Sequence, residues 1–308
     1  PLYHDLLQLP KNAKVLEEKL GVDVVENFRR DKLARAGFPK SGVSAQNRMV
    51  ERHDALYGAY WKSYDFLPET GRANLARFPL GPVFKDNPYK DQAFKHDGGE
   101  IIFNLPNGLQ GYMLVNNKDD RIDAGPIDIV GDDKRVAGNP VIVNGVSCMA
   151  CHQHGTIPFQ DTVRETNAVF GEALDKVKKL YPAKKAMDEL VAADRQKFVD
   201  ALEKATGPFL RVGADKATAI TKFKEPVTEV APGYRRGYLD LKTVAAELYE
   251  KDGQELLRKV GAKRLKELGL DGLAQPGGLV PRYQWEASDG FSLMQEAAKE
   301  IGFTPFGN

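Results

Sequence analysis

Cysteine is scarce in this chain, since Cys148 and Cys151 are the only two among its 308 residues. Two thiols exclude the disulfide framework that holds many small secreted domains together. An excess of charge of one sign is also lacking, because 44 basic residues are balanced by 43 acidic ones and the formal net charge is +1. This balance gives no electrostatic reason to expect nucleic acid or a strongly charged protein as a partner.

Long apolar runs are missing as well, and no stretch approaches the roughly 20 apolar residues that a membrane-spanning helix needs. We therefore expect no membrane span. Several common catalytic signatures are absent too, among them HExxH, the Walker A loop, the dinucleotide-binding glycine fingerprint and the GxSxG elbow. The sequence thus contains no recognised catalytic constellation of side chains.

The two cysteines stand together in Cys148-Met149-Ala150-Cys151-His152, which is the CxxCH attachment signature of c-type haem. Two thiols three positions apart lie on one side of a single turn, where both can form thioethers with the vinyl groups of one porphyrin. The imidazole that follows is then placed to ligate the iron through a ring nitrogen. At these five residues the chain resembles the c-type cytochromes.

Three other uses of the cysteine pair are open. A dithiol redox pair usually belongs to a βαβ setting, and no such pattern flanks this one. A closed structural zinc site needs four ligands, and only His152, His154 and distant residues are available to complete it. A disulfide that closes so short a loop stabilises little. The complete motif favours haem attachment over all three.

The resemblance implies one covalent haem c per chain, because the sequence has no second CxxCH. It implies that His152 is the proximal iron ligand through Nε2, with its Nδ1–H held by a carbonyl group. In c-type cytochromes that carbonyl often belongs to a proline a little further along, and Pro158 is the nearest candidate here. The spacing is shorter than in the common small cytochromes, so the alternative is that Pro158 only ends a turn.

The sixth iron ligand distinguishes an electron carrier from a protein that binds small ligands or peroxide. His96 is our first candidate for this distal ligand. It lies outside any apolar stripe, next to Asp97, which could orient its imidazole, and before two glycines that permit close backbone approach. Met113 and Met187 are the next candidates, although both lie in apolar patterns where core packing is the more common role of methionine.

The apolar pattern predicts a mainly α fold with a small antiparallel β-hairpin sheet inserted before a cytochrome c-like haem region. Residues 100–105 and 109–115 flank Pro106-Asn107-Gly108, a strong hairpin signal. A helix is expected at 44–52, and the five aromatic side chains of 57–66 are expected in the core. After residue 165 the pattern becomes helical, as in the stripe Phe170, Ala173, Leu174 and Val177.

We expect two domains, 1–140 with the N-terminal helices and the hairpin sheet, and 141–308 as the haem c-binding helical domain. A c-type haem is attached outside the cytoplasm, which implies a periplasmic or otherwise exported protein whose targeting segment has been removed before Pro1.

The expected function is one-electron transfer to or from a redox partner protein rather than catalysis. The alternative is a mono-haem enzyme, peroxidase-like, or a small-ligand-binding haem protein with an open distal site. Its support is the length of the N-terminal region, which exceeds what a carrier needs to wrap one haem. Trp61 and Lys62 could line such a distal pocket. A third possibility is a docking module that uses haem only to hold its fold together.

Overall fold

The computed structural model of the chain describes residues 2–68, 71–131, 140–227, 230, 237–286 and 292–303. The chain divides into two compact units, residues 1–229 and 230–308. The domain boundary expected at residues 140–141 therefore falls inside the first unit. The reason is that Cys148, from the segment after this boundary, packs in one core with the sheet residues Trp61 and Leu114.

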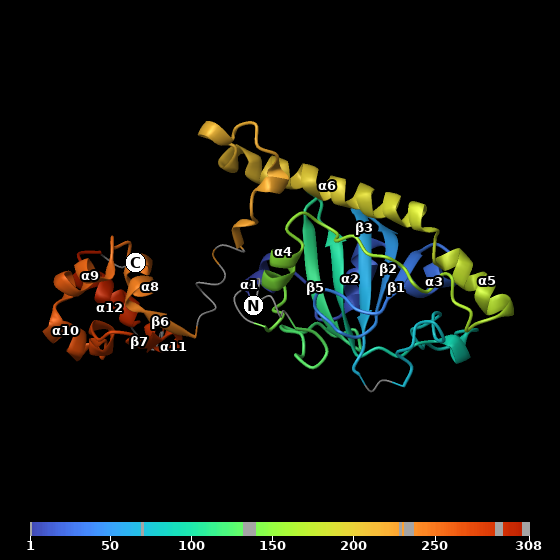
Figure 1. The fold of residues 1–308 in the computed structure, drawn as a ribbon, viewed down its shortest axis with the longest axis horizontal. Coiled ribbons are helices and arrows are strands. Elements are labelled where there is room, and N and C mark those ends of the chain that lie inside the picture. The colour runs from blue at the N-terminus through green and yellow to red at the C-terminus, as the bar shows by residue number, and fades with distance from the viewer. Residues whose placement is uncertain are drawn as a thin grey trace. The chain divides into compact units, whose positions relative to one another are not determined.

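The first unit is built on a five-stranded antiparallel sheet in which neighbours along the chain are neighbours in the sheet (Figure 1). Its strands are β1 (Ala34–Phe38), β2 (Arg48–Ala55), β3 (Gly58–Asp65), β4 (Gly98–Asn104) and β5 (Gln110–Asn116). The predicted fold class, mainly α with a small hairpin and a cytochrome c-like haem region, is therefore wrong. The CxxCH segment lies against one face of this sheet, where Cys148 packs with sheet residues.

The hairpin predicted at Asn107-Gly108 is confirmed as β4 and β5, with Ile101 opposite Met113 in the register. Gly108 has a φ of +86°, which glycine adopts without strain.

The predicted helix at 44–52 is wrong, because Arg48–Ala55 is strand β2. Its side chains alternate between the two faces of the sheet with a period of two, and both faces are covered, so the strand carries no simple apolar alternation.

Helices cover both faces of the sheet. The first face packs against the N-terminal helices α1 (Leu2–Leu6), α2 (Ala13–Leu20) and α3 (Val24–Arg29). The second face packs against α4 (Val146–Cys151) and α6 (Lys184–Leu210), while α5 (Gly171–Leu180) adds to the core of the first face. The predicted helix is confirmed as α5, in which Ala173, Leu174 and Val177 face the core, but Phe170 precedes the helix and is 76% exposed. Three of the five aromatic residues of 57–66 lie in β3, whose period of two sends Tyr60 and Tyr64 to the first face and Trp61 to the second. Phe66 is also buried, but Tyr57 is exposed.

The second unit has its own small core around Trp285, which is fully buried. Its two short strands, β6 (Tyr238–Asp240) and β7 (Leu279–Pro281), pair antiparallel. Its helices are α8 (Leu241–Glu247), α9 (Gly253–Val260), α10 (Ala262–Glu267), α11 (Arg282–Trp285) and α12 (Leu293–Glu300). Several of these helices begin at a capping side chain. At the start of α8, for example, the carboxylate of Asp240 accepts a hydrogen bond from the backbone N–H of Thr243.

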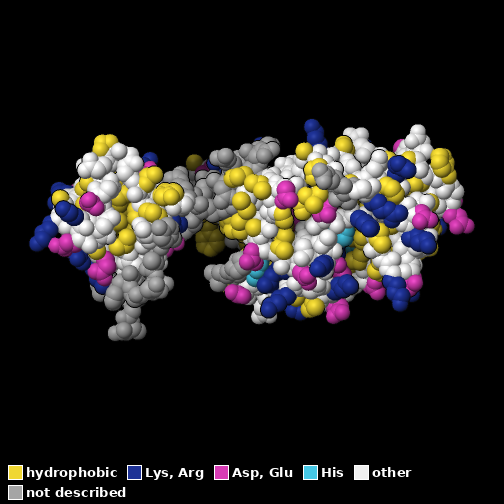
Figure 2. Space-filling view, turned by 90° about the horizontal axis from the view of Figure 1, so that it is seen from below, with side chains coloured by type: hydrophobic (Ala, Val, Ile, Leu, Met, Phe, Trp, Pro, Cys, Tyr) yellow, Lys and Arg dark blue, Asp and Glu magenta, His cyan; other side chains and the backbone are white. Residues whose placement is uncertain are grey.

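Within the part of the chain that the structure describes, none of the helices has the length and apolar character that a membrane crossing requires. Acidic and basic side chains are interspersed over the first unit on the face shown in Figure 2. This agrees with the nearly neutral net charge of the sequence.

Candidate haem-attachment site

Helix α4 presents both cysteines of the motif. The helix follows Gly145, whose φ is +80°. A Cβ at this position would lie only 2.7 Å from the ring of Tyr3, so glycine leaves room for that ring. Cys148 is buried, Cys151 is half-buried, and no disulfide joins them. The helix ends at His152. The two sulfur atoms and the imidazole are therefore delivered by one short turn of chain, as the motif requires.

A cavity of about 1040 Å³ opens beside this turn and is lined by Cys148, Cys151 and His152. Its volume is slightly above the range of roughly 300–1,000 Å³ that is usual for small-molecule and cofactor sites. The exposed surface of the walls is mainly apolar, although charged and polar residues such as Arg48, Asp65 and Glu100 also line the cavity. The apolar wall residues include Phe38, Val50, Trp61, Ile102, Leu114, Ile129, Val130, Ile142 and Phe159.

The imidazole of His152 has a fixed orientation. Nδ1 of His152 lies 3.3 Å from the carbonyl oxygen of Gly155. Because a carbonyl oxygen only accepts hydrogen bonds, Nδ1 carries a proton, and Nε2 is the nitrogen that a haem iron would bind. Pro158 lines the cavity, but the carbonyl predicted from it is supplied by Gly155. The left-handed backbone of Gly155, with a φ of +92°, turns the chain back on His152 before Pro158 is reached.

Glu100 on β4 is in contact with His152 at the cavity wall. Its Oε2 atom lies 3.7 Å from Nε2 of His152, and its side chain is 13% exposed. Burial alone would raise the pKa of Glu100, but hydrogen bonding to His152 and the charges of His152 and Arg48 lower it to about 2. Burial and the neighbouring charge of Glu100 raise the pKa of the Cys148 thiol. The carboxylate of Glu100 is thus a charged group close to Nε2 of His152.

A second charged group on the cavity wall is already paired. Nε and Nη2 of Arg48 donate to the two carboxylate oxygens of Asp65, at 2.6 and 2.9 Å. Trp61, which the sequence suggested as a pocket residue, lines the cavity and donates its indole N–H to Asp194 at 2.8 Å. Lys62 also borders the cavity, but its ammonium group binds Glu17 and Asp119.

His96 does not line the cavity. Its ring meets the edge of Tyr64, with centroids 4.9 Å apart, in the core of the first face, and burial lowers its pKa to about 4. The structure therefore does not bring His96 to the cavity beside His152. The sequence context of two glycines and Asp97 gave no information on which face of the sheet the imidazole would occupy.

The remaining histidines and methionines also lie elsewhere. All five residues of each type in the sequence fall within the described parts of the chain, and only His152 lines the cavity. Met113 and Met187, the other distal candidates, are buried in core clusters on the two faces of the sheet. The cavity wall thus contains no second imidazole and no thioether.

Two alternatives for the cysteine pair lose their support. Over the described residues, no three His, Cys, Asp or Glu side chains converge in a way that could hold a metal ion, as a protein-ligated zinc site would require. The surrounding sheet is antiparallel and consecutive, whereas a thioredoxin-like dithiol belongs to a βαβ setting.

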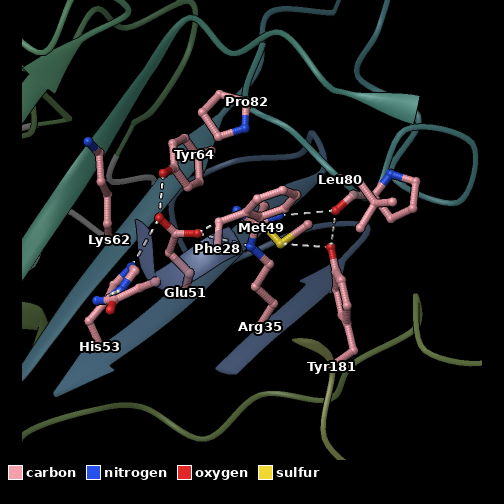
Figure 3. A network of polar contacts seen from close by, with 12 residues as sticks. Phe28, Arg35, Met49, Glu51, His53, Lys62, Tyr64, Leu80, Pro82 and Tyr181 are labelled. Atoms are coloured by element: carbon pink, nitrogen blue, oxygen red, sulfur yellow. Dashed lines mark hydrogen bonds and ion pairs between the residues drawn. The ribbon is translucent and has the colours of Figure 1, made fainter. Parts of the chain in front are cut away.

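The first face of the sheet carries a separate buried network (Figure 3). Arg35 and Glu51 are both fully buried and joined by two hydrogen bonds of 2.9 and 2.7 Å. The hydroxyl of Tyr64 donates to the other oxygen of Glu51 at 2.5 Å. Tyr181 donates to the carbonyl of Pro79 at 2.7 Å. Because the network is on the opposite face from the cavity, we assign it to the fold and not to the candidate site.

Sequence reasoning missed Glu100, Arg48 and Asp65 as wall residues. The only local signal is for Glu100, a charged residue after the glycine pair that opens β4, and this signal also fits an ordinary turn.

Comparisons with protein-family models, with curated proteins and with solved structures found no match. The resemblance to c-type cytochromes therefore rests on residues 148–152.

Proposed function

We propose that this protein binds one haem c, attached through Cys148 and Cys151, with His152 as the proximal iron ligand. The observation that carries the proposal is that all three side chains of the motif line one large, mainly apolar cavity. The residues present fit the group, because the thiols and Nε2 are delivered from one turn and Gly155 fixes the imidazole.

The chemistry of a bound haem is one-electron transfer or the binding and activation of a small ligand at the iron. The chain contributes the covalent anchors, the proximal imidazole and the apolar walls that exclude water. Since c-type haem is attached outside the cytoplasm, the proposal includes an exported, for example periplasmic, location and a redox partner protein.

Of these two roles, the cavity favours small-ligand binding at an accessible iron. A six-coordinate carrier needs a strong second ligand such as His or Met. Apart from His152, no histidine or methionine of the chain lines the cavity. The carrier function, which the sequence favoured, lacks this ligand, so we propose a redox or small-ligand-binding haem protein.

The test is the intact mass of protein matured in a host that attaches c-type haem. We expect one haem per chain that survives acid–acetone extraction. Cys148→Ser and Cys151→Ser should each leave at most one thioether, while His152→Ala should keep both thioethers and change the spin state. Haem that extracts freely from the wild type, or a mass without haem, contradicts the proposal.

The same sample distinguishes small-ligand binding from electron transfer. An accessible iron should bind CO rapidly in the reduced protein. Low-spin, six-coordinate iron in both oxidation states, together with slow CO binding, would support the carrier function instead.

A further inference from the structure

Glu100 holds an unusual place for a carboxylate in an apolar cavity. Its Oε2 atom lies 3.7 Å from Nε2 of His152, the atom that the CxxCH motif assigns to the iron. Its side chain is 13% exposed. A buried charge of this kind is costly unless a partner compensates it. The partner in the haem-loaded protein therefore has to be identified.

The position of Glu100 is fixed by the sheet. Glu100 lies in β4 between β3 and β5, opposite Leu114, and its backbone N–H donates to Oγ of Ser63 at 2.8 Å. The preceding Gly99 has no room for a Cβ, which would lie 2.0 Å from the backbone oxygen of Ser63. The strand thus cannot shift easily, and the carboxylate stays in front of His152.

Haem attachment would remove the contacts of Glu100 with the imidazole of His152 and the thiol of Cys148. Thioether formation consumes the S–H of Cys148, and iron binding occupies Nε2 of His152. Arg48 is committed to Asp65 through two hydrogen bonds. The charge of Arg48 still favours the ionised carboxylate from nearby, and the haem iron would supply the direct partner that Arg48 does not.

We propose, on the basis of the haem c function above, that the carboxylate of Glu100 is the sixth ligand of the iron, opposite His152. Metal bonds to imidazole nitrogen and to carboxylate oxygen are about 2 Å long in protein zinc sites, and bonds of similar length to iron would place two opposite ligand atoms about 4 Å apart. This agrees with the 3.7 Å between Nε2 and Oε2. A carboxylate is a weak-field ligand, so it leaves ferric iron high-spin and gives way to incoming ligands such as cyanide or CO.

The experiment compares the ferric holoproteins by electron paramagnetic resonance and visible absorption, with cyanide as the probe ligand. The wild type should be high-spin. Glu100→His should convert the iron to a low-spin, bis-imidazole form. Glu100→Gln, which keeps the size but loses the charge, should bind cyanide faster than the wild type. His96→Ala is the control, and its spectrum and cyanide binding should equal those of the wild type because His96 lies outside the cavity.

A low-spin wild type overturns the assignment of Glu100, and so does a folded Glu100→His protein that stays high-spin. If Glu100→His fails to fold, unchanged cyanide binding in Glu100→Gln overturns it. The intact mass of each sample separates the two proposals. Covalent haem with no response to Glu100 removes only the ligand assignment, whereas absence of covalent haem from the wild type removes both.

Discussion

At the scale of single residues, Arg35 and Glu51 form an ion pair with no exposure to solvent. Such a pair is tolerated only when its remaining hydrogen-bonding atoms are satisfied. Tyr64 meets this need by donating to Glu51, and the guanidinium of Arg35 also lies 5.0 Å from the ring centre of Phe28. The charge of Arg35 lowers the pKa of Glu51, against the effect of burial. Glu51 therefore stabilises the fold above its unfolded pKa of about 4.3, and this contribution is lost as the pH falls.

We predict that Glu51→Leu lowers the free energy of unfolding by about 3–5 kcal/mol, because it leaves the charge of Arg35 buried without a partner. The double variant Arg35→Met with Glu51→Leu should recover much of this loss, since no buried charge remains. Urea denaturation measures both. Lys184→Ala removes an exposed pair with Asp188 and serves as the control, with an expected effect below about 1 kcal/mol. A Glu51→Leu variant as stable as this control would contradict the prediction.

At the scale of elements, the sequence predicts the parts of the sheet whose signals are local. The hairpin of β4 and β5 follows from an Asn-Gly turn between apolar runs. β2 was missed because its buried positions hold Glu51 and His53, whose partners come from distant parts of the chain. A charged residue in a buried strand position cannot be distinguished from a surface residue until its partner is known.

The same limit applies to the site. Cys148, Cys151 and His152 are recognised because the chemistry of attachment requires them to be adjacent in sequence. Glu100 lies about 50 residues away from them and reaches the cavity only through the pairing of β4 with its neighbours. Gly155 replaced Pro158 as the carbonyl partner because the local backbone turns early, which spacing alone did not reveal.

The close approach of β3 and β4 gives a prediction for Gly99. Gly99→Ala should destabilise the protein by about 1–3 kcal/mol, because its Cβ would lie 2.0 Å from a backbone oxygen of the adjacent strand. Gly71→Ala is the matched control, with no atom within 4 Å of the added Cβ. Urea denaturation of the two variants measures the difference. Equal stability of both would show that the strands separate at little cost.

At the scale of the whole molecule, each unit has its own apolar core, and the cavity belongs to the first. All residues that line the cavity lie between Phe38 and Thr162. The core of the second unit consists of residues between Leu239 and Ile301. A unit with its own core can fold alone, so the haem site should not require the second unit.

We predict that a fragment of residues 1–229 folds, attaches haem and has the absorption spectrum of the full chain. A fragment of residues 141–308 is the informative control, because it contains the complete CxxCH but lacks the sheet that forms the cavity wall. It should lack the native spin state even where haem becomes attached, since the thioethers need only the motif whereas the iron environment needs the sheet. Intact mass and absorption spectra of the two fragments provide the measurement. A native spectrum from 141–308, or a fragment 1–229 without haem, would show that the site is built by the C-terminal half, as the sequence pattern first indicated.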